Sequence, residues 1–147
     1  LRGALCLRSL RVITLSSWSA YDRAKLPRVG AELLDVLPNL DHLVLRGLYI
    51  DRPIDVRALT LAPMRPDVSS IGAALAGHRW TELRELTYEL PPLLTQPLEL
   101  ADLAALADRE VAPKLERLTI RNVPDYRIAT MTALLEERGV ELVLTAC

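Results

Sequence analysis

The sequence contains few of the side chains that catalytic and metal sites use. Its 147 residues include two cysteines and two histidines. Neither Cys6 nor Cys147 has a partner at CxxC spacing, so we expect no zinc site. His42 and His78 are 36 residues apart and lie on different predicted elements, so they form no catalytic constellation. The sequence therefore predicts no catalytic residue, no metal and no cofactor, and we expect the chain not to be an enzyme.

An excess of charge and a long hydrophobic run are also lacking. Lys and Arg number 18 against 19 Asp and Glu, which gives a formal net charge of −1 at pH 7. Because proteins that bind nucleic acid carry a basic patch, this balance indicates no nucleic-acid partner. No run of about 18 apolar residues occurs, so no transmembrane span is expected. The six glycines are scattered and form no phosphate-binding loop.

One short pattern, however, occurs six times: an apolar residue, then Thr or Val, then a second apolar residue. The copies are Ile13-Thr14-Leu15, Leu43-Val44-Leu45, Leu59-Thr60-Leu61, Leu86-Thr87-Tyr88, Leu118-Thr119-Ile120 and Leu142-Val143-Leu144. In five copies further apolar residues precede the triplet at a spacing of about three, as in APKLERLTI from Ala112. The change from spacing three to spacing two predicts a bend that leads into a short strand.

The intervals between the copies indicate a repeat architecture. The central residues stand at positions 14, 44, 60, 87, 119 and 143, which are 30, 16, 27, 32 and 24 residues apart. Most intervals are close to the 20–29 residues, roughly, of a leucine-rich repeat. On these triplets and intervals, essentially the whole chain resembles the leucine-rich repeat superfamily. It is most similar to the irregular intracellular types, such as ribonuclease inhibitor, F-box proteins and bacterial repeat proteins.

The resemblance implies an α/β fold, a leucine-rich repeat solenoid of about six repeats. A curved parallel β-sheet would form the concave side, and helices and loops the convex side. We expect residues 1–147 to form a single leucine-rich repeat domain that is a fragment of a longer chain. The family usually has Asn or Cys three residues after the last strand leucine. Here these positions hold other residues in all copies but the last, so we expect apolar turns: Trp18, Leu48, Met64, Pro91, Val123 and Cys147.

The segments between the triplets predict helices and one extended connection. Apolar residues at helical spacing predict helices at 29–37, 67–77, 97–109 and 125–138, and Gly139 is expected to end the last one. The 16-residue interval is too short for a helix. We therefore expect an extended connection there, with Tyr49 and Ile50 over the core and Pro53 preventing a helix. Trp80 occupies the first apolar position of its repeat and is expected to be buried.

In this register the residues that alternate with the apolar ones point outward in three columns. The first column is Val12, His42, Ala58, Glu85, Arg117 and Glu141. The middle column is Thr14, Val44, Thr60, Thr87, Thr119 and Val143. The third column is Ser16, Arg46, Ala62, Glu89, Arg121 and Thr145. From these columns we select ten candidate partner-binding residues: His42, Val44, Arg46, Thr60, Glu85, Thr87, Glu89, Arg117, Thr119 and Arg121.

The charged members of the columns permit two interpretations. In parallel register Glu85 faces Arg117, which has Glu141 on its other side, and Glu89 faces Arg121. These side chains either form a polar patch that binds a partner or neutralise one another as cross-strand pairs. An exposed pair contributes roughly 0–1 kcal/mol, and we favour the second interpretation. The middle column of Thr and Val is typical of strand residues in general.

Leucine-rich repeats generally bind proteins, so the resemblance implies a protein–protein interaction module whose partner is another protein or preceding repeats of the same chain. A purely structural role for the segment is a further possibility. Cys6 and Cys147 would lie at opposite ends of the solenoid, so we expect no disulfide and an intracellular, cytoplasmic setting. The alternative is a compact flavodoxin- or STAS-like α/β domain with an enzymatic or phospho-switch role. It would use the ending ALLEERGVELVLTAC as a helix–Gly–strand unit.

Overall fold

The six repeated triplets form the centres of six strands. The computed structural model describes residues 11–16, 28–29, 35, 37–50, 53–62, 79–90, 109–122, 132 and 135–145. One six-stranded parallel sheet contains β1 (Val12–Ser16), β3 (His42–Arg46), β5 (Ala58–Ala62), β6 (Glu85–Glu89), β7 (Arg117–Arg121) and β8 (Glu141–Thr145). The six predicted strands and their parallel arrangement are thereby confirmed.

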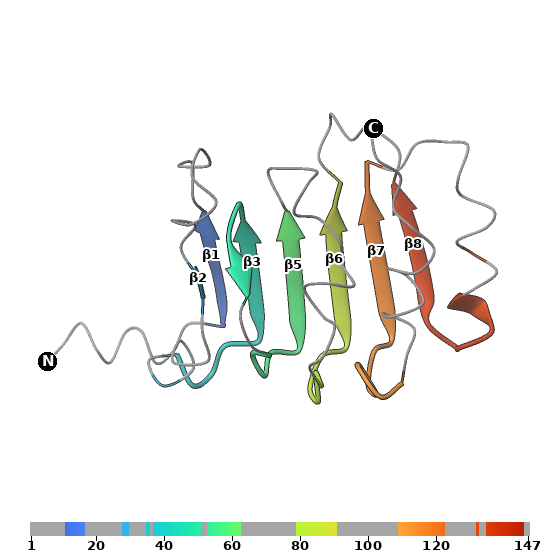
Figure 1. Ribbon diagram of the computed structural model, residues 1–147, viewed down its shortest axis with the longest axis horizontal. Helices are drawn as coiled ribbons and strands as arrows, with labels where there is room; N and C mark the ends of the chain where they lie inside the picture. The colour runs from blue at the N-terminus through green and yellow to red at the C-terminus, as the bar shows by residue number, and fades with distance from the viewer. Residues whose placement is uncertain are drawn as a thin grey trace, which may run out of the picture.

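The strands follow one another across the sheet in the order in which they occur along the chain. The spatial order is β1-β3-β5-β6-β7-β8, and Figure 1 shows the strands side by side from β1 to β8. Every strand pairs with the next without a shift, so that Thr14 is the partner of Val44 and Thr87 the partner of Thr119. Such repeated, in-register parallel strands fit a repeat-like fold in which each unit is stacked on its neighbours.

The apolar residues of each triplet face the core. In β3, β5, β6 and β7 both flanking residues are buried, as Leu43 and Leu118 show with an exposed fraction of 0% each. The apolar residues that precede the triplets are buried as well. They are Leu37, Leu40, Ile54, Val56, Trp80, Leu83, Ala112 and Leu115. Burial of one such aliphatic side chain contributes roughly 1.5–3 kcal/mol. The change of spacing seen in the sequence therefore describes one continuous core, and the predicted burial of Trp80 is confirmed.

Backbone hydrogen bonds hold successive units in register just before the strands begin. The carbonyl of Arg11 accepts bonds from the N–H groups of Asp41 at 2.8 Å and His42 at 2.9 Å. The carbonyl of Arg57 accepts from Arg84 at 2.9 Å and from Glu85 at 3.1 Å in the same way. Because this bond pair recurs between units, the residues before the strands are aligned as closely as the strands themselves.

A helix ends at Gly139 just before the last strand, as the sequence predicted. Leu135 and Glu136 are helical, and Gly139 follows with a φ of 70°, a left-handed conformation that favours glycine. The N–H of Gly139 donates to the carbonyl of Glu136, and the N–H of Val140 donates to that of Leu135. These two bonds form a Schellman motif, with Leu135 and Val140 buried on the same side. The predicted helix stop at Gly139 is confirmed.

Two expectations about the connections need correction or completion. Val29 does not begin a helix, because Arg28–Val29 form the short strand β2, which pairs in parallel with β4 (Tyr49–Ile50). This pairing confirms the extended connection between β3 and β5, although the side chains of Tyr49 and Ile50 lie outside the described residues. The predicted helix at 67–77 also lies outside the described residues. Of the helix predicted at 97–109, residues 97–108 lie outside them, and the last residue, Arg109, is in a turn.

One turn is closed by a polar side chain that the sequence analysis did not identify. Asn122 has a φ of 62°, and its Nδ2 donates to the carbonyl of Leu90 at 3.0 Å. The expectation of wholly apolar turns is therefore wrong at this position. Leu48 packs against the core, which confirms an apolar closure after β3. The asparagine was missed because it stands one residue earlier than the family pattern places it.

Candidate functional site

The ten candidate residues share one face of the sheet, on strands β3, β5, β6 and β7. The three predicted columns coincide with the first, third and fifth residues of the six strands. We call the surface formed by these residues the outer face. Its register follows the strand pairs, so that His42, Ala58, Glu85 and Arg117 are neighbours in the first column. The structure thus brings together all ten residues selected from the sequence.

The middle of the outer face is a row of β-branched side chains that are largely packed together. Val44, Thr87 and Thr119 are half-buried, whereas Thr60 is only 6% exposed. The Oγ1 of Thr60 lies 2.9 Å from the Nε2 of His42, which reaches it from the neighbouring strand. His42 is therefore held by the sheet in a polar contact and does not project alone. This row offers a partner a shallow strip of methyl and hydroxyl groups.

A three-residue ion cluster lies in the third column of the outer face. The Glu89 carboxylate accepts from Arg121 at 3.0 Å and from both terminal nitrogens of Arg46, at 3.1 and 3.4 Å. Arg46 reaches Glu89 from two strands away because Ala62, which lies between them in the column, has only a methyl group. We call these three residues the Arg46–Glu89–Arg121 cluster. Its Glu89–Arg121 pair was expected, but the contribution of Arg46 was not.

In the first column, only one of the two carboxylates beside Arg117 forms an ion pair with it. The Nε of Arg117 donates to Glu141 at 2.7 Å, and among the described residues Arg117 forms no ion pair with Glu85. The hydrogen bond from Arg117 to Glu141 and the charge of Glu141 raise the pKa of the Arg117 guanidinium. Glu85 faces Arg117 in register, and its charge also raises the pKa of Arg117. Within the described part of the chain, the first column therefore has one carboxylate that forms no ion pair.

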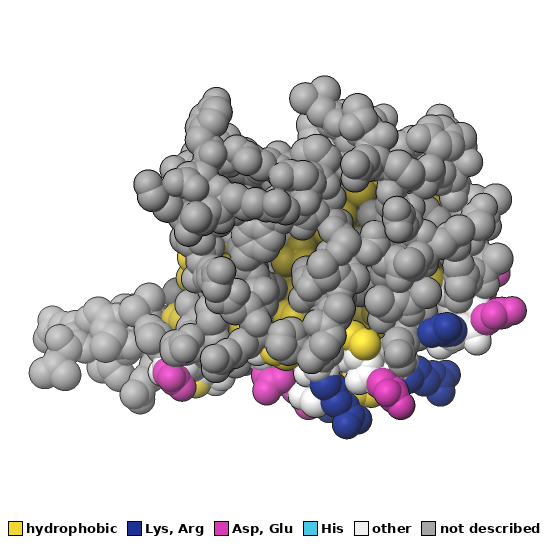
Figure 2. Space-filling view, in the orientation of Figure 1, with side chains coloured by type: hydrophobic (Ala, Val, Ile, Leu, Met, Phe, Trp, Pro, Cys, Tyr) yellow, Lys and Arg dark blue, Asp and Glu magenta, His cyan; other side chains and the backbone are white. Residues whose placement is uncertain are grey.

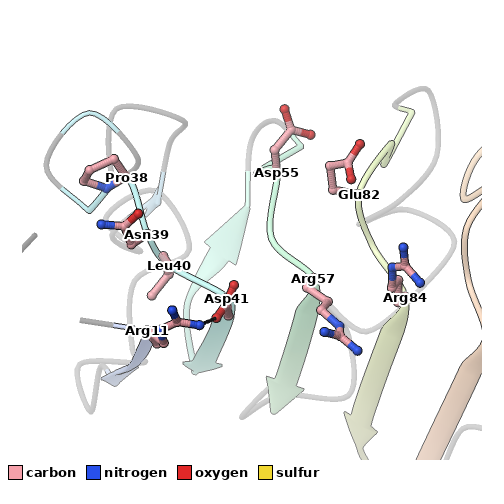
Figure 3. Close-up of a pocket in the computed structure, with 9 residues that line it drawn as sticks. All are labelled: Arg11, Pro38, Asn39, Leu40, Asp41, Asp55, Arg57, Glu82 and Arg84. Atoms are coloured by element: carbon pink, nitrogen blue, oxygen red, sulfur yellow. Dashed lines mark hydrogen bonds and ion pairs between the residues drawn. The ribbon is translucent and has the colours of Figure 1, made fainter. Parts of the chain in front are cut away.

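A second polar region lies along the edge where the strands begin. Figure 2 shows charged side chains along the lower margin, where Figure 1 places the starts of the strands. A hollow of about 520 Å³ opens there between Arg11, Asp41, Asp55, Arg57, Glu82 and Arg84, with Pro38, Asn39 and Leu40 beside them. Figure 3 shows Asp55 and Glu82 on one side of this hollow and Arg57 and Arg84 at the starts of two neighbouring strands.

Most charged groups of this hollow are already paired. Arg11 binds Asp41 at 3.0 Å, Arg84 binds Glu116 at 2.7 Å and Lys114 binds Glu82 at 2.7 Å. These residues occupy equivalent positions before successive strands, a recurrence in the sequence that could have predicted the edge. Because all these pairs are exposed, each contributes roughly 0–1 kcal/mol to stability. The hollow is accordingly a shallow, salt-bridged surface with little apolar contact to offer.

Within the described residues, no three His, Cys, Asp or Glu side chains lie close enough together to hold a metal ion. No helix of the described part of the chain is long and apolar enough to cross a membrane. Comparisons with protein-family models, with curated proteins and with solved structures found no match to this chain. The outer face and the edge where the strands begin are therefore the two surfaces that bear on function.

Proposed function

We propose that this chain is a protein-interaction module of the leucine-rich repeat type that binds a partner protein through its outer face. One observation carries the proposal. Six strands in unshifted register display three columns of side chains that vary in size and charge, above inner positions that are uniformly apolar. A stacked-repeat framework of this kind presents an extended surface for contact.

The chemistry of the outer face favours binding over catalysis. Several of its polar groups are engaged with one another, as in the His42–Thr60 contact and the Arg117–Glu141 pair. The His42–Thr60 contact does pair a hydroxyl with an imidazole, but among the described residues no third group orients the His42 ring, which is what the arrangement for covalent catalysis requires. A half-buried row of threonine and valine, with charged residues in the columns on either side, instead resembles the less charged centre and polar rim of protein interfaces.

The arrangement of strands supports the repeat solenoid over the flavodoxin- or STAS-like alternative. Flavodoxin-like sheets have a point at which the strand order reverses, and ligands bind there. The order β1-β3-β5-β6-β7-β8 contains no such reversal. The proposal also includes an intracellular, cytoplasmic setting, since a chain with two cysteines lacks the disulfide-dense composition of small secreted domains.

Site-specific photo-crosslinking tests which surface binds. A photoreactive phenylalanine analogue replaces Thr87 in one variant and Thr119 in a second, both on the outer face. A matched control carries the same analogue at Thr81, an exposed threonine of the strand-start edge. We expect a discrete crosslinked partner from the first two variants, competed by excess unmodified chain, and none from the third. Crosslinking of the same partner from Thr81 alone would contradict the proposal.

A further inference from the structure

The Arg46–Glu89–Arg121 cluster has more positive charge than it neutralises. Two guanidinium groups converge on one carboxylate, so the cluster carries a net charge of +1. The side chain of Glu89 is only 14% exposed, while those of Arg46 and Arg121 are 50% and 52% exposed. The negative charge is therefore covered and the positive charges face solvent.

The geometry leaves hydrogen-bond donors available for a second anion. A guanidinium has five N–H donors, and each arginine uses only one or two of them in its contacts with Glu89. Both arginines approach the same Oε1 of Glu89, so their free donors are near each other on the outer face. Arginine binds carboxylates in a bidentate, charge-assisted manner, which makes an incoming carboxylate the group that fits this position best.

The other end of the same strand limits the kind of anion. Glu85, four residues before Glu89 in β6, has no ion pair among the described residues. Four residues of a strand span roughly 13 Å. A polyanion such as nucleic acid would place negative charge beside Glu85 and be repelled. A polypeptide avoids this repulsion if it has an acidic residue at the cluster and a neutral or basic one about 13 Å away.

We propose that the partner presents an acidic polypeptide segment to the outer face, with an Asp or Glu carboxylate bound between Arg46 and Arg121. This inference rests on the proposed function and specifies the partner's chemistry. Glu89 holds the two arginines in position, and the row formed by Val44, Thr60 and Thr87 contacts the apolar part of the segment. A basic side chain of the segment lies toward Glu85.

A peptide selection followed by affinity measurements tests this inference. Random 12-residue peptides are selected on the full chain, and those that lose binding to a Thr87→Trp variant are retained, since this bulky, uncharged side chain obstructs the outer face without attracting acidic peptides. We expect these peptides to be enriched in Asp and Glu. Their dissociation constants, measured by fluorescence anisotropy, should rise about tenfold in Arg46→Gln/Arg121→Gln, since two charge-assisted contacts are lost. The matched control Arg84→Gln, which removes an arginine from the strand-start edge, should change them less than about twofold.

A variant of Glu89 separates binding by the cluster from its structural role. Glu89→Gln keeps the side-chain shape and raises the cluster charge to about +2. We expect the acidic peptides to bind this variant several-fold more tightly, provided circular dichroism shows the wild-type spectrum. Weaker or unchanged binding by Glu89→Gln would overturn the inference. So would retained peptides that are not acidic and bind Arg46→Gln/Arg121→Gln normally, although the proposed function would then stand. A selection with no peptide sensitive to Thr87→Trp would overturn both.

Discussion

The two faces of the sheet are built from the same five-residue strands but obey different rules. On the inner face the positions are filled by aliphatic residues and one tyrosine, and in the four central strands all of them are buried. On the outer face the equivalent positions include Thr60, which is 6% exposed, and Val12, which is 57% exposed, and they carry both signs of charge. The difference indicates that the repeat is a requirement of packing. The outer positions hold side chains of many kinds because most of them are not part of the buried core.

The largest expected contrast between the faces lies within a single strand. Leu118 and Thr119 are adjacent in β7, and Leu118 is wholly buried whereas Thr119 is half-buried on the outer face. Leu118→Ala should lower the free energy of unfolding by about 2–5 kcal/mol, because it removes a buried side chain and leaves a cavity. Thr119→Ala should lower it by less than about 1 kcal/mol. Urea denaturation measures both, and equal effects would contradict the division of roles.

A smaller effect is expected where the inner face reaches the end of the sheet. Leu142 in β8 occupies the position equivalent to Leu118 but is only partly buried. Leu142→Ala should therefore cost about half as much as Leu118→Ala, since the transfer free energy scales with the apolar area removed from water. The same urea titration compares the two variants. A cost for Leu142→Ala as large as that of Leu118→Ala would show that β8 is covered as fully as the central strands.

A still smaller effect is expected at the turn that leads into β8. Gly139 has a φ of 70°, and a Cβ placed there would meet no atom within 4 Å. Gly139→Ala should therefore cost about 1 kcal/mol through backbone conformation alone. Gly139→Asn serves as the matched variant and should cost less, because asparagine adopts this conformation more readily. Thermal unfolding followed by circular dichroism measures the difference, and a stable Gly139→Ala would contradict the helix-end geometry.

The sequence predicted the features that repeat and missed those that depend on a single side chain. The six strands and three columns could be predicted because each triplet places apolar residues at the inner positions. The reach of Arg46 to Glu89 could not, since it depends on the small size of Ala62 between them. The pairing of β2 with β4 was missed because two-residue strands contain no periodicity. Arg117 forms its ion pair with Glu141 and not with Glu85, and the strand register alone does not decide between these two neighbours.

The most direct test of the account is a paired measurement of folding and binding on Thr87→Trp. The substitution places a large, uncharged side chain at the centre of the outer face and leaves the buried neighbours Leu86 and Tyr88 unchanged. We expect the urea midpoint to stay close to that of the wild type, while affinity for the partner crosslinked from Thr119 falls at least about tenfold. Unchanged affinity in a variant that is fully folded would contradict the claim that the outer face is the binding surface.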